Sequence, residues 1–595
     1  MSPSVVTEAA LREAARLELG GDLLAAYDTI AAGLVEDPTS IQLRHRAVLL
    51  LARGGAVSQA RREYLRLGLN DVHDHVDAIS LGGRLLKDLA FAASGETRRQ
   101  VARESAARYG EAYALHRDYY PGINVATMAL VAGDLARSSD LARAVLKDLS
   151  APGDDHAGDA YYRAATRAEA HFLLGRLDDA ERALAAAIAL DPHNYTAHAS
   201  TLRQLDIICA TLKLDRDWLD HHSPPPPVSY CGHMFGEATT TPEAMIALTG
   251  KIGTALDRLR PCAAFGALAA GADIVVAEAV LARGAELHVV LPMNEKTFLA
   301  RSVAPFGDGW VARYQDCKGR ATTFRIASHE NDFDDDVVFA FGSEFAMGLA
   351  IRHGDMLRTR ACQLAAWDGA PSAGVAGTGA DVARWAVTKL PQVVVEFPRR
   401  ASAPASAATP ARSTERRLKA MLFGDVRGFS KLTEAEIRPF VEHILAPVAG
   451  ALRGLPSAPD LVATWGDGIH VVCESIADAA TAALAMQASF AGIDLAAAAL
   501  PAHLALRIGG HFGPVAELTN PFLGTPNFYG THVTIAARIE PVAVPGTVYV
   551  SEPFAALLAL QATGQFRSEY VGQTELPKGF GTMRLFALRH AEVPT

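Results

Sequence analysis

The sequence predicts a chain of three parts: α-helical repeats first, a parallel α/β domain in the middle and an α+β domain last. Its 595 residues exceed what one hydrophobic core usually organises. A run of four prolines at 224–227 and an Ala/Ser/Pro/Arg-rich stretch from 398 onward interrupt the helix and strand patterns. We therefore expect a helical domain over 1–222, an α/β domain over 228–397, a flexible linker over 398–416 and an α+β domain over 417–592.

Composition narrows the class of protein. Half of the residues are hydrophobic and 21% are charged, which is typical of a globular chain in water. The net charge of −10 argues against a nucleic-acid partner, and the six cysteines, scattered without a CxxC pair, indicate reduced thiols. Because the sequence has neither a signal-peptide pattern nor a long uncharged apolar run, we expect no membrane segment and a cytoplasmic location.

The first part carries a repeated spacing of glycine, alanine and proline. Intervals of five and twelve residues separate Gly21, Ala26 and Pro38, and the same intervals separate Gly175, Ala180 and Pro192. Glycine lets two helices cross closely, alanine fills the contact and proline ends the second helix, so the segment resembles a tetratricopeptide repeat. These helices either form a scaffold only or offer a concave face to a protein partner. The run YYPGIN at 119–124 resembles a feature of helical modules fused to bacterial signalling enzymes.

From Val228 the pattern alternates between strands and helices. The segments that show this alternation are VSYCGHM, CAAFGALAAGADIVVAEAVLARGAELHVVLP, CQLAAWDG, GVAGTGADVARWAVTKL and PQVVVEF. Such βαβ units predict a parallel sheet with helices on both faces. Glycines stand where strands end and helices begin, and at that place backbone N–H groups and a helix dipole can hold a phosphate.

The stretch 266–292 resembles the Rossmann-like nucleotide-binding fold shared by DNA-processing protein A and the lysine-decarboxylase-like phosphoribohydrolases. The resemblance implies a second nucleotide or phosphate site, with the candidates Gly232, Gly266, Gly271, Gly377, Thr378 and Gly379. Two other interpretations stay open. The glycines can be plain turns, or the domain, with Glu278 on the following helix, can be an N-glycosidase whose last domain is regulatory. The arginine and glycine signature of those hydrolases is incomplete here.

The last part places two aspartates where strands end or turn. A strand over 418–423 is expected to end at Asp425, and GFSKLTE is expected to begin a helix after it. About forty residues on, DLVATWGDGIHVVCES predicts a β-hairpin whose Gly-Asp-Gly turn presents Asp467. Two such carboxylates that meet in space can hold two divalent ions against a triphosphate. Alone, an aspartate at a strand end is more often a turn residue.

The order of the segments that follow supports a functional role for the two aspartates. RIGGHFGPV at 507–515 is expected to form a strand and a glycine turn; NFYGTHVTIAARIEPVAVPGTVYVSE and TELPKGFG follow. This order is similar to the catalytic domain of class III adenylyl and guanylyl cyclases, over nearly the whole last part. The resemblance implies a ferredoxin-like α+β fold that converts a nucleoside triphosphate to a 3′,5′-cyclic nucleotide and pyrophosphate, with two Mg²⁺ or Mn²⁺ ions per site.

The resemblance assigns roles to individual residues. Asp425 in FGDVRGF and Asp467 in WGDG match the metal aspartates, and Val426 stands where a backbone carbonyl also touches the metal. Arg538 in AARIE matches the arginine that stabilises the pentavalent phosphate, and Lys578 in PKGFG matches the lysine that holds the terminal phosphates. These side chains supply two anions for metal and two cations for phosphate.

Three positions depart from the family pattern. Cyclases that prefer ATP usually carry lysine where this chain has Ala463 and aspartate where it has Asn527, and the asparagine that orients the ribose is Thr534 here. An asparagine both donates and accepts hydrogen bonds, so the sequence does not indicate which base is bound. The domain is therefore either an active cyclase with an unusual base pocket or an inactive nucleotide-sensing scaffold.

The resemblance also implies an assembly. In this family the metal aspartates come from one subunit and the arginine from its partner, so a chain with one such domain is expected to form a head-to-tail homodimer. We expect the first two parts to sense a protein partner or nucleotide ligand and to change how the two catalytic domains close, through dimer geometry rather than a rigid lever. Chains of these three parts resemble bacterial stress or antiphage signalling proteins.

Overall fold

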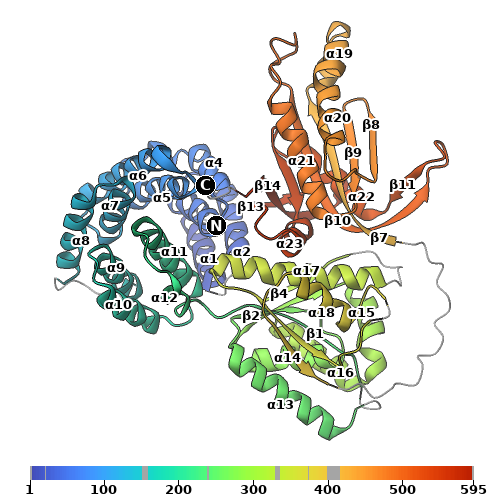
Figure 1. Cartoon of the computed structure of the whole chain (residues 1–595), viewed down its shortest axis with the longest axis horizontal. Helices are drawn as coiled ribbons and strands as arrows, with labels where there is room; N and C mark the ends of the chain where they lie inside the picture. The colour runs from blue at the N-terminus through green and yellow to red at the C-terminus, as the bar shows by residue number, and fades with distance from the viewer. Residues whose placement is uncertain are drawn as a thin grey trace. The chain divides into compact units, whose positions relative to one another are not determined.

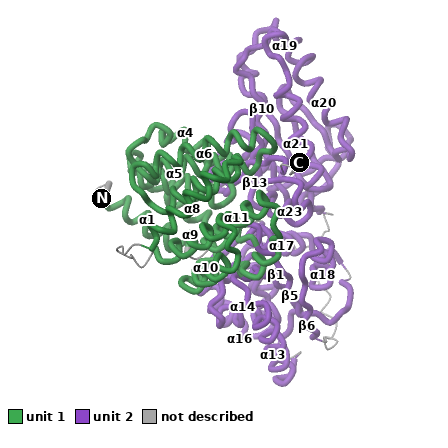
Figure 2. Tube along the Cα trace, turned by 60° about the vertical axis from the view of Figure 1, so that its left-hand side comes forward, with its two compact units in different colours: residues 1–224, 356–358, 592–595 green, residues 225–355, 359–591 purple. Residues whose placement is uncertain are grey.

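The structure is a computed structural model, which describes residues 3–19, 22–150, 159–236, 240–328, 336–372, 374–397 and 416–591. Gly21 and all of the expected linker except Arg416 lie outside these ranges. The described residues form two compact units: one contains residues up to 224 together with 356–358, and the other contains 225–355 and 359–591 (Figure 2). The predicted fold class is confirmed, with helices first, a parallel sheet next and a mixed sheet last.

The first unit is helical wherever it is described (Figure 1). Its helices are α1 Pro3–Leu19, α2 Leu23–Glu36, α3 Ile41–Arg53, α4 Val57–Arg66, α5 Val76–Ala92, α6 Gly95–Leu115, α7 Tyr119–Ala132, α8 Leu135–Ser150, α9 Ala160–Leu173, α10 Leu177–Leu190, α11 Tyr195–Leu212 and α12 Asp217–Asp220. Small residues allow close crossings. A Cβ on Gly83 would stand 2.8 Å from the Tyr109 ring, and Ala168 and Ala180 are fully or almost fully buried. None of the described helices is long and apolar enough to cross a membrane.

A buried polar network joins four helices of this unit. The Lys87 ammonium group on α5 donates to Asn124 on α7 at 2.8 Å and to Gln204 on α11 at 2.9 Å. Gln204 in turn donates to Glu169 on α9 at 2.8 Å. Burial lowers the pKa of Lys87 to about 8, because the charged form loses its hydration. Asn124 belongs to the YYPGIN run, so one polar residue of that run fixes α7 against its neighbours.

The central domain is a six-stranded parallel sheet in the order β4-β3-β2-β1-β5-β6. Its strands are β1 Val228–Gly232, β2 Ala263–Gly266, β3 Glu286–Leu291, β4 Thr323–Ile326, β5 Cys362–Trp367 and β6 Gln392–Glu396. The helices between them are α13 Pro242–Leu259, α14 Ala272–Ala282, α15 Glu295–Ser302, α16 Asp308–Arg320, α17 Asp336–Leu357 and α18 Thr378–Val387. The strand order reverses between β1 and β5, so right-handed crossovers put α13, α14 and α16 on one face and α17 and α18 on the other (Figure 1).

The C-terminal domain is a mixed sheet in the order β13-β14-β12-β10-β7-β9-β8, with β11 paired to β10. Its strands are β7 Arg416–Arg427, β8 Leu461–Trp465, β9 Gly468–Cys473, β10 Ala505–Thr519, β11 Pro526–Tyr529, β12 Val548–Ser551, β13 Phe566–Glu575 and β14 Thr582–His590. Its helices are α19 Glu434–Phe440, α20 Ala446–Arg453, α21 Ile476–Ala491, α22 Thr531–Ile539 and α23 Glu552–Gln561. The long strands β7 and β10 pair side by side and form the centre of the sheet.

The structure corrects three local predictions in this domain. β7 does not end at Asp425 but continues to Arg427, because it stays paired to β10. GFSKLTE forms a short 3₁₀ turn, and α19 begins only at Glu434, where Thr433 makes a capping box with Glu436. The glycines of RIGGHFGPV lie inside β10 rather than in a turn. A Cβ on Gly509 would stand 2.3 Å from the backbone nitrogen of Glu540, so these glycines let the next helical segment lie against the strand.

Candidate metal and nucleotide site

Strand pairing brings Asp425 and Asp467 together. Asp425 lies on β7, and Asp467 lies in the two-residue turn between β8 and β9, where Gly466 has a φ of 65°. A positive φ of this kind is easily adopted only by glycine, so Gly466 permits the tight turn. Because β7 pairs with β9 up to Gly424 and Ile469, the turn is carried to the side of Asp425. The predicted strand and hairpin thus supply the two carboxylates from neighbouring strands.

Asp425 and Asp467 both carry carboxyl groups, so negative charges on the two side chains repel each other. Burial, followed by the charge and hydrogen bond of Asp425, raises the pKa of Asp467 to about 6. The backbone N–H of Val426 also bonds to the Asp467 carboxyl group and opposes this shift. Two carboxyl groups held this close are a pair whose negative charge a divalent cation can neutralise.

The protein alone offers too few ligands for a magnesium-type ion, so water and substrate phosphates must supply the others. In the described part of the chain, no group of three or more His, Cys, Asp or Glu side chains has metal-binding geometry. Magnesium is commonly bound by one or two carboxylates together with water and substrate phosphates. Asp425, Asp467 and the backbone at Val426 fit that incomplete set, whereas a closed structural site would need more ligands.

Neither Arg507 nor Glu540 was predicted from the sequence to belong to the site, yet both lie at the aspartate pair. The Arg507 guanidinium group stands 2.8 Å from Asp425 and 2.9 Å from Glu540. Burial raises the pKa of Glu540 to about 7; Arg507 opposes this shift, and the aspartates Asp425 and Asp467 add to it. The register places Arg507 directly opposite Asp425. Only this pairing of β10 with β7 could have revealed the contact, because the two residues are far apart in the sequence.

Arg538 and Lys578 form a second group. The Arg538 guanidinium carbon lies 5.6 Å from the centre of the Phe580 ring, and Lys578 is exposed in the adjoining turn with a φ of 63°. Nε of Arg538 is buried and has no hydrogen-bond partner among the described residues. Arg538 and Glu540 are two residues apart on a helical segment, and so about 200° apart around its axis. Because Glu540 faces the aspartates of its own chain, helix geometry predicts that the Arg538 side chain lies on the opposite side of the segment.

The three positions that depart from the family pattern lie on separate elements. Ala463 on β8 stands opposite His470 on β9. Asn527 on β11 donates to the Tyr529 hydroxyl at 3.4 Å, and the Thr534 hydroxyl on α22 donates to the backbone oxygen of Gly530 at 3.4 Å. Within the described chain, none of these contacts reaches Asp425 or Asp467.

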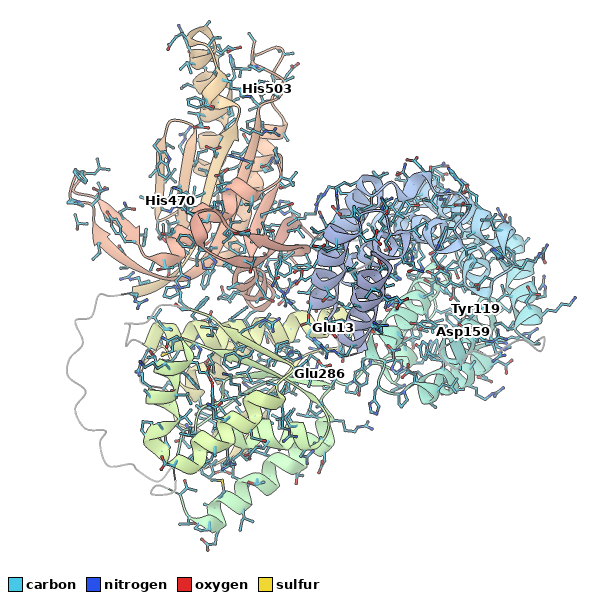
Figure 3. All side chains as sticks on the ribbon, turned by 180° about the vertical axis from the view of Figure 1, so that it is seen from behind. Glu13, Tyr119, Asp159, Glu286, His470 and His503 are labelled. Atoms are coloured by element: carbon cyan, nitrogen blue, oxygen red, sulfur yellow. The ribbon has the colours of Figure 1, made fainter. Side chains whose placement is uncertain are left out.

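An aromatic surface surrounds Ala463. Figure 3 labels His470 on the strands of this domain; its ring stacks on Phe423 with 4.3 Å between centroids. Trp465 lies 6.5 Å from His470 and is 57% exposed. Burial lowers the pKa of His470 to about 4, so the ring is neutral at physiological pH. A small side chain at 463 therefore leaves an apolar, uncharged face where a lysine would place a cation.

Close packing accounts for the glycines of the central domain. A Cβ on Gly232 would stand 2.3 Å from Ala272 Cβ, one on Gly266 would stand 2.7 Å from the Tyr230 ring, and Gly271 has a φ of 104°. The buried Asp273 lies in the first turn of α14, and burial raises its pKa well above the usual range. A carboxyl group at that place does not favour an anion.

The second glycine loop has a similar arrangement. Gly377 precedes α18 with a φ of 98°, Thr378 is buried, and a Cβ on Gly379 would stand 2.8 Å from the backbone oxygen of Ala370. Burial raises the pKa of Asp381, in the first turn of this helix, to about 7. The phosphate site of this domain stays a prediction.

The residue named for an N-glycosidase is engaged elsewhere. Both carboxyl oxygens of Glu278 accept hydrogen bonds from Arg313 on α16, at 2.7 and 2.5 Å. A bidentate ion pair of this kind uses lone pairs of both carboxyl oxygens. Hydrolase chemistry at Glu278 therefore stays a prediction without added support.

Two protein-family models match parts of the chain. Residues 414–590 match the model of the adenylate and guanylate cyclase catalytic domain, and residues 22–129 match the model of tetratricopeptide repeats-sensor. No curated protein matches the chain.

Similar solved structures are cyclase domains. The guanylate cyclase domain of RhGC from Catenaria anguillulae is 18% identical and covers 30% of this chain and 99% of its own, with a TM-score of 0.26. The adenylyl cyclase CyaB from P. aeruginosa is 15% identical and covers 29% and 95%, with a TM-score of 0.25. An adenylate cyclase from Trypanosoma brucei is 18% identical and covers 32% and 95%, with a TM-score of 0.26. On the family models, the chain carries a C-terminal adenylate and guanylate cyclase catalytic domain and an N-terminal tetratricopeptide repeat-sensor region.

Proposed function

We propose that this protein is a nucleotidyl cyclase that converts a nucleoside triphosphate to a 3′,5′-cyclic nucleotide and pyrophosphate at a site shared by two copies of the chain. The observation that carries the proposal is the Asp425–Asp467 pair, which strand pairing brings together within a domain that matches the cyclase model; burial and then the charge of Asp425 raise the pKa of Asp467 to about 6. In the reaction the ribose 3′ oxygen bonds to the α-phosphorus, the bond to the β-phosphate oxygen breaks, and the 3′ hydroxyl proton is lost.

The metal requirement follows from the carboxylates. Two Mg²⁺ or Mn²⁺ ions, held by Asp425, Asp467 and the backbone carbonyl of Val426, would lower the pKa of the 3′ hydroxyl group and neutralise the leaving pyrophosphate. In the free protein the Arg507 guanidinium group pairs with Asp425 and so offsets part of the negative charge at the site. Divalent ions are therefore expected as cofactors, and a nucleoside triphosphate as substrate.

The cations have separate tasks. Arg538 would stabilise the negative charge that develops on the α-phosphate, and Lys578 would bind the terminal phosphates. Thr534 would hold the ribose with one hydrogen bond. Since helix geometry predicts that Arg538 lies away from the aspartates of its own chain, it is available to the site of a second copy, and this supports a head-to-tail homodimer with two equivalent sites. The first two parts of the chain would regulate this dimer through a protein partner or nucleotide ligand.

A catalytically inactive nucleotide-sensing scaffold is the second candidate. The observation in its favour is the base pocket. Ala463 and Asn527 stand where adenylyl cyclases usually carry lysine and aspartate, and Thr534 stands where they carry asparagine. Loss of base recognition reduces selectivity, whereas loss of a metal aspartate would end the chemistry. The intact aspartate pair therefore favours the enzyme.

One experiment separates the two candidates. The purified full chain is incubated with Mn²⁺ and each of ATP, GTP, CTP and UTP, and the products are identified by mass spectrometry. A cyclic monophosphate from any of them establishes the cyclase and names the base. Absence of product from all four, with the dimer intact by light scattering, would support the scaffold.

The base pocket gives a prediction of its own. The double change Ala463→Lys and Asn527→Asp should raise the ratio of kcat/KM for ATP over GTP by about tenfold or more, because it restores one donor and one acceptor for the adenine edge. Each single variant should have a smaller effect. Equal ratios in the wild type and the double variant, measured by competition between ATP and GTP, would show that these positions do not contact the base.

A further inference from the structure

A buried chain of four polar side chains runs from the C-terminal domain into the central domain. Ser551 Oγ lies 2.7 Å from His511 Nδ1, His511 Nε2 lies 2.8 Å from His532 Nδ1, and His532 Nε2 lies 3.2 Å from Ser328 Oγ. All four residues are at most 2% exposed. Ser328 lies two residues after the end of β4, and its backbone N–H donates to the backbone oxygen of Pro292. The chain therefore links the edge of the parallel sheet to the first turn of α22.

The surroundings of His532 are shaped to hold its ring. A Cβ on Gly513 of β10 would stand 2.3 Å from His532 Nδ1, so only glycine leaves room there. The rings of His511 and His532 are parallel, with 5.1 Å between centroids and an angle of 6° between planes. Phe341 of α17 meets His532 edge-on at 5.5 Å. Contacts from β10 and α17 thus fix the ring from two domains.

The protonation of the chain is set by burial. Burial and the neighbouring His532 hold the pKa of His511 well below its usual range, so this imidazole is neutral. A neutral imidazole has one N–H donor and one acceptor nitrogen, and each bond between two such rings orients the next bond. Removing the Ser328 hydroxyl group would remove one hydrogen bond of the buried His532 ring and disturb the chain.

Other contacts keep the same two domains together. A Cβ on Gly348 of α17 would stand 2.1 Å from the backbone oxygen of Ala556 on α23, so these helices touch through their backbones. Arg325 at the end of β4 pairs with Glu552 at 3.3 Å. Gln561 of α23 donates to Glu344 of α17 at 3.0 Å. The Ser328–His532 contact therefore lies within a larger packed interface.

We infer that Ser328 and His532 are positioning residues, through which the central domain sets the orientation of α22 and of Thr534 and Arg538 on it. The inference rests on the proposed function, because those two residues act in the reaction only if the domain is a cyclase. Thr534 and Arg538 follow His532 by two and six residues on the same short helix. A rotation of the helix at its first turn moves both side chains relative to a bound nucleotide.

The test removes the hydroxyl group from the central-domain side. In the full chain with Mn²⁺, Ser328→Ala should lower kcat about tenfold while KM for the nucleotide stays within about twofold, because the binding cations remain and only their alignment changes. Hydrogen exchange of the 531–539 amides should become faster. Ser328→Thr, which keeps the hydroxyl group, should restore much of kcat. Ser302→Ala removes a hydroxyl group from an equally buried serine of the central domain and should leave both readouts unchanged.

A second variant guards against simple unfolding. His532→Phe keeps a ring of similar size but removes both nitrogens, so it should reproduce the loss, and combining it with Ser328→Ala should add little. Wild-type kcat together with wild-type exchange over 531–539 in Ser328→Ala would overturn the inference. If the wild-type chain makes no cyclic nucleotide, the proposed function fails, and the exchange measurement alone still decides whether Ser328 holds α22.

Discussion

Replacing Asp467 with asparagine is expected to reduce cyclic nucleotide formation by at least about a thousandfold. Asparagine keeps the size of the side chain and its place in the turn but removes the charge that a divalent cation needs. The same loss is expected for Asp425→Asn. Both variants should stay folded, because neither side chain belongs to the hydrophobic core. Product is measured by mass spectrometry at saturating Mn²⁺.

In the metal-free protein, the Asp467→Asn change should raise thermal stability near neutral pH. The folded pKa of Asp467 is about 6, above its ordinary value of 3.8, so this group adds to stability below about pH 4, and that contribution is lost as the pH rises through 6. Near neutral pH, Asp467→Asn should therefore melt slightly higher than the wild type. Because the group is partly exposed, the gain should not exceed about 1 kcal/mol. At about pH 4 the two proteins should melt alike.

Manganese makes the comparison sharper. Binding to the folded state stabilises the wild type, and this rise in melting temperature should disappear in Asp467→Asn. A matched control is Asp494→Asn, the same change in an exposed loop outside the site. Turnover by Asp467→Asn near the wild-type rate, or an undiminished shift with Mn²⁺, would refute the assignment of the metal site.

Arg538→Ala is expected to lower kcat by about a hundredfold to a thousandfold. The guanidinium group has a buried Nε without a partner among the described residues, which fits a side chain whose partner is a substrate. Since helix geometry predicts that it lies away from the aspartates of its own chain, the rise in melting temperature with Mn²⁺ should be unchanged. Arg453→Ala, at an exposed position on α20, serves as control. A loss of the Mn²⁺ effect, or a normal kcat, would count against the assigned role.

The sequence was sufficient for those parts of the site that depend on local patterns. Local patterns indicate the apolar strand that carries Asp425 and the hairpin turn that carries Asp467, and strand pairing brings β9, which follows that turn, beside β7. Arg507 was missed because its meeting with Asp425 depends on the register of two strands that lie about eighty residues apart. Nothing in the sequence near Arg507 indicates that register.

Local sequence patterns also gave wrong predictions where a residue is required by a contact with a distant part of the chain. Glycines in RIGGHFGPV suggest a turn, yet Gly509 and Gly513 serve the close approach of Glu540 and His532 to a continuous strand. Likewise, Gly348 gives no sign in the sequence that it meets Ala556 more than two hundred residues later. The contacts between the central and C-terminal domains are packed ones that no local pattern in the sequence indicates.

The claim that two copies share each site is tested most directly by mixing broken chains. Asp425→Asn and Arg538→Ala chains are co-expressed with different affinity tags and purified through both tags, so that every dimer contains one of each. One of the two sites then has both aspartates and the arginine, and we expect about half of the wild-type activity, far above either variant alone. Mixed dimers no more active than the single variants would contradict a site shared between subunits.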